Sequence, residues 1–210
     1  MSRVQENGKR FYVSPTGDKY PSVTTVTGLL TRDHIKLWRE RVGEEEANKI
    51  SSVAARRGTK MHALFEQYLR AEEELVFENI LDQAMFNAVQ PVLDDIVPIA
   101  LEAGMYSDSL QMAGQVDCVG LWDDELCIID FKTSSRVKTE DEIDSYFIQM
   151  AAYAIMCEER TDTPVSQGVI VMAVENHAKP LVFVQKRDRW TEELFKTINE
   201  YNTKKLFGHA

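Results

Sequence analysis

MAGQVDCVG (residues 112–120) and LCIIDFKT (residues 126–133) are two strand-like segments joined by the acidic turn Asp123-Asp124. Both segments are rich in apolar and β-branched residues, and a two-residue turn between such segments predicts a β-hairpin. The register that this turn sets places Asp117 opposite Asp130. Like charges in directly opposed positions destabilise a strand pair, so we expect a divalent cation to neutralise the two carboxylates.

Strand alternation determines which groups share this predicted site. Asp130 and Lys132 lie on one face of their strand, whereas Ile129 and Phe131 lie on the other. Lys132 should therefore flank the pair of carboxylates. Oxygen ligands beside an ammonium group suit Mg²⁺ or Mn²⁺ acting on a phosphate ester. The predicted chemistry is phosphodiester hydrolysis.

Three motifs in chain order carry a resemblance to a known family: AGQVD at 113–117, IDFKTS at 129–134 and QMAAY at 149–153. Together they resemble the PD-(D/E)XK nuclease superfamily, and more specifically its RecB-like branch, which includes phage exonucleases and mitochondrial genome maintenance exonucleases. The likeness runs from about residue 20 to the last predicted strands. It implies an α/β fold with a restriction-endonuclease-like core, a mixed central β-sheet flanked by helices, and a helical N-terminal part.

A predicted helix before the hairpin carries His62 and Glu66, which lie four residues apart and therefore on one helix face. A histidine and a glutamate at this spacing are commonly a surface pair. The resemblance implies instead that His62 is a metal ligand and that Glu66 is an acidic partner of the metal site, direct or through water.

Gln149 and Tyr153 lie one turn apart on a predicted helix after the hairpin. The resemblance implies that this pair shapes the site and contacts DNA near the scissile phosphate, with Gln149 acting in catalysis. A glutamine at a polar helix edge and a tyrosine ring in the core are the alternative. Tyr146 lies about one turn before Gln149 and is suited to stacking on a base, although packing accounts for it equally well.

Three further polar residues are candidates for the site. Glu102 lies in the strand before Asp117, where the superfamily sometimes has its first acidic ligand; the alternative is an exposed strand residue. Thr133 and Ser134 follow Lys132, where they would bind a phosphate or cap a loop.

Hydrophobic periodicity predicts the remaining elements. A small hairpin at residues 11–20 precedes the helices, Asp33 is a predicted helix N-cap, and Gly58 is a point where the long helix could be interrupted. The predicted helices cover about residues 44–70, 79–96, 141–159 and 190–206, and the predicted strands cover 99–106, 110–122, 125–132, 168–174 and 181–185. We expect a single nuclease domain over residues 1–210, with the small hairpin and helices in 1–97 and the catalytic sheet with its covering helices in 98–210.

The chain of 210 residues has a net charge of −10 and a pI near 5.0. Affinity for phosphate comes largely from Lys and Arg, so this balance argues against a generic nucleic-acid-binding surface. Basic residues nevertheless cluster locally, as at Arg56-Arg57 with Lys60 and at Arg136 with Lys138. Such clusters are commonly solvated faces, but a groove can be basic on an acidic protein.

The three cysteines lack CxxC spacing, which predicts free thiols in a reducing compartment and no iron–sulfur cluster. The first residues contain no apolar segment typical of a signal peptide, and no apolar run approaches the roughly 20 residues that span a bilayer. We therefore expect a protein without a membrane partner in the cytoplasm, or in the host cytoplasm if a phage encodes it.

These observations predict a metal-dependent deoxyribonuclease, specifically an exonuclease of single-stranded DNA that acts in replication, recombination or repair. Asp117, Asp130, the backbone carbonyl of Phe131 and His62 would hold one or two Mg²⁺ or Mn²⁺ ions. Lys132 would orient the attacking water or stabilise the transition state. Replication or recombination proteins are expected partners. Polarity, exonuclease versus endonuclease action, DNA versus RNA, and oligomeric state stay open.

Two other readings are compatible with the residues. One is a non-catalytic nucleic-acid-binding or recombination accessory protein on the same fold. The other is a structural scaffold in which Asp130 and Lys132 form a surface ion pair. Intact Asp117, Asp130 and Lys132 favour the nuclease, because a binding module does not require two opposed carboxylates.

Overall fold

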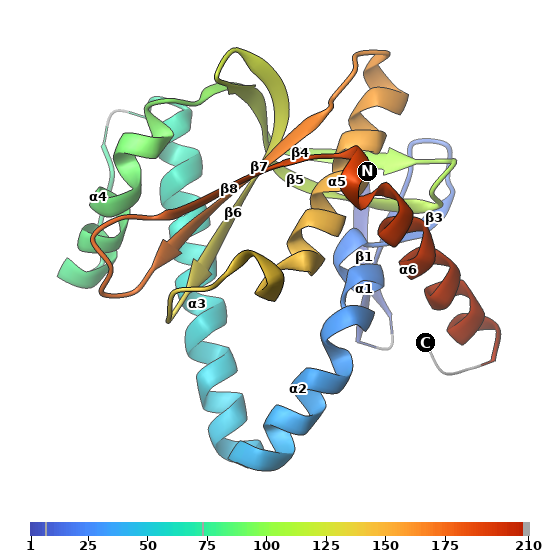
Figure 1. Ribbon diagram of the computed structural model, residues 1–210, viewed down its shortest axis with the longest axis horizontal. Coiled ribbons are helices and arrows are strands. Elements are labelled where there is room, and N and C mark those ends of the chain that lie inside the picture. The colour runs from blue at the N-terminus through green and yellow to red at the C-terminus, as the bar shows by residue number, and fades with distance from the viewer. Residues whose placement is uncertain (7, 73, 208–210) are drawn as a thin grey trace.

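The computed structural model of the protein describes residues 1–6, 8–72 and 74–207. Within these residues the chain forms two β-sheets and a set of helices that cover the larger sheet (Figure 1). The smaller sheet is antiparallel and N-terminal, and its strands are β1 (Ser2–Glu6), β2 (Lys9–Val13) and β3 (Lys19–Pro21). The predicted N-terminal hairpin corresponds to β2 and β3, whereas β1 was not predicted.

The larger sheet has five strands in chain order: β4 (Val97–Ser107), β5 (Met112–Trp122), β6 (Glu125–Ser134), β7 (Gln167–Val174) and β8 (Leu181–Lys186). Only the β6–β7 pair is parallel, so the sheet is mixed. A parallel pair requires a crossover connection, which α5 (Asp144–Thr161) provides here. The predicted mixed central sheet is thus confirmed.

The β5–β6 hairpin has the predicted register. Asp123 and Asp124 both adopt left-handed backbone conformations, with φ of 49° and 61°, as a two-residue type I′ turn requires. The ladder pairs Leu121 with Leu126 and continues to Cys118 opposite Ile129. One more step in this register brings Asp117 to the position opposite Asp130.

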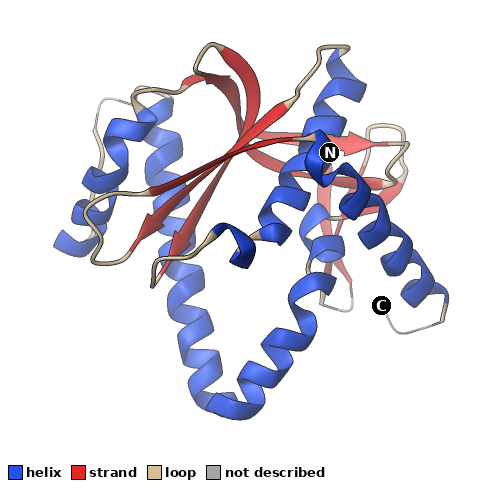
Figure 2. Ribbon diagram, in the orientation of Figure 1, coloured by secondary structure: helices blue, strands red, loops and turns tan. Residues whose placement is uncertain are grey.

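Helices cover both faces of the five-stranded sheet (Figure 2). One face packs against α3 (Glu44–Leu69) and α4 (Ile80–Leu93), and the other packs against α1 (Val23–Thr27), α5 and α6 (Asp188–Leu206). The alternation along β6 divides its side chains between the two cores. Ile128 belongs to the core under α5, whereas Ile129 and Phe131 belong to the core under α3.

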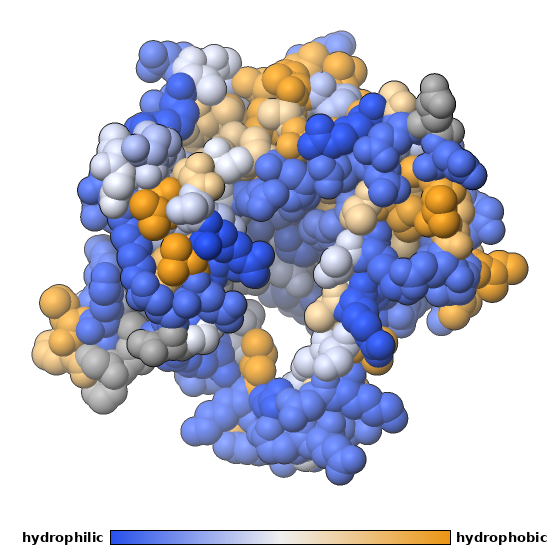
Figure 3. Space-filling view, turned by 180° about the vertical axis from the view of Figure 1, so that it is seen from behind, coloured by the Kyte–Doolittle hydropathy of each residue, from blue (hydrophilic) through white to orange (hydrophobic). Residues whose placement is uncertain are grey.

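α2 (Leu29–Val42) and the first half of α3 project from the body as an arm (Figures 1 and 2). No residue of α2 is buried, and in α3 the buried residues other than Ala47 begin at Met61. Gly43 joins the two helices with a φ of 91°, which only glycine adopts readily. Seen from behind, the tip of the arm is almost entirely hydrophilic and an opening separates it from the body (Figure 3).

Two predicted details of these helices are wrong. Asp33 is not an N-cap, because α2 begins at Leu29 directly after Gly28 and Asp33 lies inside the helix. Gly58 does not interrupt α3, which runs unbroken through it. Of Ser22 and Thr24, the two residues whose type suits an N-cap of α1, Ser22 is the cap, since its side chain accepts a hydrogen bond from the amide of Thr25.

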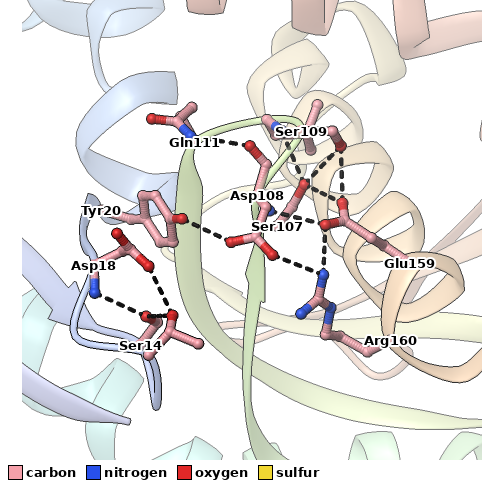
Figure 4. Close-up of polar contacts among 11 residues, drawn as sticks. Ser14, Asp18, Tyr20, Ser107, Asp108, Ser109, Gln111, Glu159 and Arg160 are labelled. Atoms are coloured by element: carbon pink, nitrogen blue, oxygen red, sulfur yellow. Dashed lines mark hydrogen bonds and ion pairs between the residues drawn. The ribbon is translucent and has the colours of Figure 1, made fainter.

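A polar network attaches the N-terminal sheet to the body (Figure 4). The hydroxyl of Tyr20 donates a 2.7 Å hydrogen bond to Asp108 in the β4–β5 turn. Arg160 of α5 forms an ion pair with Asp108 at 3.1 Å, and Glu159 accepts a 2.8 Å bond from Ser109. None of the described helices is both long and apolar enough to cross a membrane.

Candidate active site

Asp117 and Asp130 lie side by side in the centre of the larger sheet. Oδ2 of Asp117 accepts a 2.8 Å hydrogen bond from the backbone amide of Phe131, which ties the acidic side chain of β5 to β6. Asp130 is 1% exposed, so its carboxylate has lost almost all contact with bulk water. The hairpin register therefore produces the carboxylate pair that the sequence predicts.

Both oxygens of Asp130 have partners. The side-chain amide of Gln149, from α5, donates a 2.7 Å hydrogen bond to Oδ1. Oδ2 is buried, and its ion-pair partner is the ammonium group of Lys132. Burial and the neighbouring Asp117 raise the pKa of Asp130 to about 6, although Lys132 acts in the opposite direction.

The two neighbouring carboxylates keep Lys132 protonated. Burial acts to lower its pKa, but the carboxylates of Asp130 and Asp117 outweigh burial and raise it. Lys132 is therefore an ammonium ion beside the two acids.

His62 approaches the acids from α3. Its Nδ1 lies 3.5 Å from Oδ1 of Asp117. Burial disfavours the imidazolium, but the interaction with Asp117 more than compensates and raises the pKa of His62. The same interaction acts on Asp117, whose pKa lies below its ordinary value even though burial alone would raise it.

Glu102 completes a group of three ligand-type side chains. Each of His62, Glu102 and Asp117 has one potential ligand atom within 4.8 Å of those of the other two. Glu102 has a φ of 50° inside β4, a left-handed conformation that is uncommon for a residue with a side chain. The amide of Gln115 donates a 2.8 Å hydrogen bond to its carboxylate. Burial and the nearby Asp117 and Glu66 raise the pKa of Glu102 to about 7.

This donor set fits a hard divalent cation. Two carboxylates and an imidazole are close enough to share one ion, whose positive charge would offset the burial and the neighbouring carboxylates that raise the pKa of Glu102. Asp130 lies outside the group of three, and its two oxygens contact Gln149 and Lys132. The structure thus brings together two of the four predicted ligands, His62 and Asp117, with Glu102, which was a further candidate in the sequence.

Two further predicted site groups are the backbone carbonyl of Phe131 and the carboxylate of Glu66. The Phe131 carbonyl accepts a 3.4 Å hydrogen bond from Lys132. Glu66 is one turn beyond His62 and lines a shallow pocket with His62 and Glu102, but its carboxylate binds Arg70 at 2.8 Å.

The two predicted tyrosines differ in their surroundings. Tyr153 is 3% exposed, and its hydroxyl lies against Gly114. The ring of Tyr146 has the ammonium groups of Lys132 and Lys138 at 5.1 and 5.3 Å from its centre, so cations rather than a free face surround it.

Thr133 and Ser134 are not among the described residues that line the cavity around His62, Glu102 and Asp117. Strand alternation turns Thr133 to the opposite face, where its hydroxyl lies near Gly58. The hydroxyl of Ser134 donates a 2.6 Å hydrogen bond to the carbonyl of Arg136. The loop-capping alternative thus describes Ser134.

A cavity of about 420 Å³ contains the group of three together with Lys132, Gln149 and Tyr153. Several of its lining residues were not predicted as site residues from the sequence: Arg3, Arg10, Tyr12, Ser22, Gly114 and Gln115. Gln115 could have been found, because it lies two residues before Asp117 and therefore on the same strand face. The residues near the N-terminus carry no such local signal.

Comparison with known proteins points to one family. Residues 36–207 match the family described as the PD-(D/E)XK nuclease superfamily. Mitochondrial genome maintenance exonuclease 1 of Homo sapiens is 30% identical over 205 residues, which cover 88% of this chain and 59% of that protein. The protein of the same name from Xenopus tropicalis is 28% identical over 186 residues, covering 82% and 53%. The Mus musculus protein is 28% identical over 172 residues, covering 74% and 51%. The chain spans between half and three fifths of the length of these relatives.

Proposed function

Because this chain belongs to the PD-(D/E)XK nuclease superfamily, we propose that it is a nuclease, specifically an exonuclease that hydrolyses single-stranded DNA with Mg²⁺ or Mn²⁺. One observation carries this proposal. Asp117, Asp130 and Lys132 converge on two adjacent strands, and His62 lies 3.5 Å from Asp117.

The metal would be held by residues from three elements: His62 of α3, Glu102 of β4 and Asp117 of β5, with Asp130 beside them. When bound there, a divalent cation supplies positive charge that stabilises the charge building up on the phosphate during hydrolysis.

Lys132 performs the second part of the chemistry. Its ammonium group lies against Asp130, where it orients the water that attacks phosphorus or stabilises the pentacovalent transition state. Attack forms a new P–O bond and breaks the bond to the leaving sugar oxygen. Gln149 acts through Asp130, because its hydrogen bond fixes the orientation of that carboxylate.

The preference for exonuclease action is supported by the relatives, whose names describe exonucleases. The preference for single strands is supported by a second cavity of about 630 Å³ that shares Thr24, Tyr146 and Gln149 with the catalytic cavity. This second cavity is lined by Trp38 of the arm, by Lys138, and by Arg136 with its ion-pair partner Glu142. Indole rings stack on unpaired bases, and the cations suit a backbone.

Cleavage of end-labelled oligonucleotides tests this proposal. Single- and double-stranded DNA, and single-stranded RNA of the same sequence, are incubated with the protein and Mg²⁺, Mn²⁺ or EDTA. Each substrate is labelled at either the 5′ or the 3′ end. We expect metal-dependent release of short products from single-stranded DNA. The remaining labelled strands should become progressively shorter from one end.

The product pattern distinguishes the alternatives. Internal fragments as first products would indicate an endonuclease, and preferential cleavage of RNA would overturn the substrate assignment. Binding of DNA without any metal-dependent cleavage would support the non-catalytic accessory protein instead.

A further inference from the structure

The catalytic cavity has a wall that lies outside the matched segment of the family. The match begins at residue 36, yet Arg3, Arg10, Tyr12, Ser22 and Thr24 line the cavity with His62 and Asp117. The N-terminal segment is therefore part of the site in space.

The pairing of β1 with β2 places two arginines on one face of the small sheet. Arg3 is directly opposite Tyr12, and Arg10 is two residues from Tyr12 along β2. Side chains at these positions share a face and are neighbours across the strands. Tyr12 is 6% exposed and packs with Tyr20 and Ala113 of the larger sheet, so this is the face that is turned towards the cavity.

The small sheet is held at a defined position over the cavity. Tyr20 is joined to Asp108, which in turn is joined to Arg160 of α5 (Figure 4). The amide of Ser22 also donates a 2.9 Å hydrogen bond to the carbonyl of Arg10, so the backbone that carries Arg10 is fixed to the start of α1.

The guanidinium groups of Arg3 and Arg10 have no side-chain partner within the described chain. Neither guanidinium has an ion pair or a hydrogen bond with another described residue, whereas Lys132 is paired with Asp130. The carboxylates of Glu102 and Asp117 line this cavity, and those of Asp130 and Glu66 lie beside it. Neither arginine forms an ion pair with any of these four groups. A guanidinium is a planar group of donors that matches the oxygens of a phosphate.

We propose that Arg3 and Arg10 form a phosphate clamp, which binds a backbone phosphate of the substrate strand next to the scissile one. This inference rests on the proposed function, because it takes a polynucleotide as the substrate. The clamp supplies the local positive charge that a chain with a net charge of −10 requires to hold a polyanion beside its acidic centre.

Binding without cleavage tests the clamp. The affinity of a fluorescent single-stranded DNA oligonucleotide is measured in EDTA by anisotropy, over a series of salt concentrations, for the wild type, Arg10→Ala, Arg10→Lys and the double variant Arg3→Ala/Arg10→Ala. Lys205→Ala is the matched control, since Lys205 is an exposed cation on α6 away from the cavity. Thermal unfolding of each variant verifies that it is folded.

We expect Arg10→Ala to weaken binding about tenfold and to reduce the salt slope of log Kd by about 0.7, the value for one phosphate contact on a single strand. Arg10→Lys should recover part of the affinity, because it keeps the charge but not the bidentate geometry. Lys205→Ala should bind as the wild type does. In cleavage assays with Mg²⁺ or Mn²⁺, Arg10→Ala should raise KM more than it lowers kcat.

Chemical removal of single phosphate charges locates the contact. Oligonucleotides with one methylphosphonate at successive positions should show one position where neutralisation weakens the wild type but not the double variant. A parallel pair with a 5′-phosphate or a 5′-hydroxyl shows whether the clamped phosphate is terminal instead. Either pattern supports a phosphate clamp at these arginines, and only the first places it on the backbone.

Failure of the clamp and failure of the proposed function give different results. A wild type that binds the oligonucleotide, with Arg10→Ala and Arg3→Ala/Arg10→Ala equal to it in affinity, salt slope and methylphosphonate sensitivity, would overturn the clamp and leave the nuclease proposal standing. A wild type that neither binds nor cleaves DNA would overturn the proposed function itself.

Discussion

The side-chain amide of Gln149 donates a 2.7 Å hydrogen bond to Oδ1 of Asp130, and both side chains are buried. The other oxygen of Asp130 faces Lys132. The orientation of this carboxylate is therefore set from two sides, by a neutral donor on α5 and by a cation on its own strand.

Gln149→Ala should lower catalytic activity without abolishing it. Loss of a group that orients a catalytic or metal-binding side chain typically reduces activity about 10- to 100-fold. The variant should also unfold more easily by about 1–3 kcal/mol, because Asp130 is left with a buried acceptor. Single-turnover cleavage and denaturant unfolding measure the two effects.

Gln90→Ala is the matched control for this variant. Gln90 is a half-buried glutamine whose amide binds the hydroxyl of Tyr68, away from the cavity. Its removal should leave cleavage unchanged. If Gln149→Ala and Gln90→Ala have the same activity, Gln149 does not position Asp130.

Gly114 is predicted to tolerate no side chain. A Cβ atom at this position would lie 2.5 Å from the hydroxyl oxygen and 2.8 Å from a ring carbon of Tyr153. Because Tyr153 is buried beside the cavity, Gly114→Ala should destabilise the fold by about 1–3 kcal/mol and also reduce cleavage. Adding Tyr153→Phe should recover only part of the stability, since the ring carbon stays in place.

Gly58→Ala is the opposing control. A Cβ at Gly58 meets only Thr133 at 3.8 Å, an ordinary contact, and Gly58 lies inside α3. Alanine is favoured over glycine in a helix interior, so this change should stabilise the protein by about 0.5–1 kcal/mol. Equal effects of the two substitutions on the free energy of unfolding would contradict the packing described for Gly114.

The stability of the metal-free protein should depend on the ionisation of Glu102. The folded protein raises its pKa from 4.5 to about 7, so the stabilisation associated with this group is fully present below its ordinary value and is lost as the pH rises through 7. In EDTA, the free energy of unfolding of the wild type should fall by about 1–2 kcal/mol relative to that of Glu102→Gln as the pH rises from 4.5 to above 7. This is less than the full pKa shift implies, because solvent partly screens the group.

Unfolding of both proteins at a series of pH values measures this difference. Glutamine keeps an oxygen that can accept the hydrogen bond from Gln115 but has no charge. Added Mg²⁺ or Mn²⁺ should stabilise the wild type most at high pH. A constant difference between the two proteins across the range would show that folding does not raise the pKa of Glu102.

The sequence was sufficient to predict features that depend on neighbours along the chain. The β5–β6 register follows from the two aspartates of the turn, which tolerate left-handed backbone, and from the alternation around Asp130. The start of α2 could not be predicted in this way. Asp33 looks like a cap, but α1 leads directly through Gly28 into α2, so the helix starts earlier.

The remaining parts of the site depend on contacts between distant segments. Arg10 reaches the cavity because the small sheet docks on the β4–β5 turn through Tyr20 and Asp108, a contact with no local pattern. The hydrogen bond from Gln149 to Asp130 likewise requires the position of α5 over β6. Glu102 joins the ligand group although its conformation is unusual for a strand.

The rate of nucleotide release from end-labelled single-stranded DNA, with Mg²⁺ or Mn²⁺ and with EDTA, tests the central claim most directly. The proteins compared are the wild type, Asp130→Ala and Lys132→Ala, with the exposed Asp95→Ala and Lys205→Ala as matched controls. We predict cleavage that EDTA abolishes, that falls by at least about 10²–10³-fold in the two site variants, and that the controls retain. Undiminished cleavage by folded Asp130→Ala would contradict the assignment of the active site.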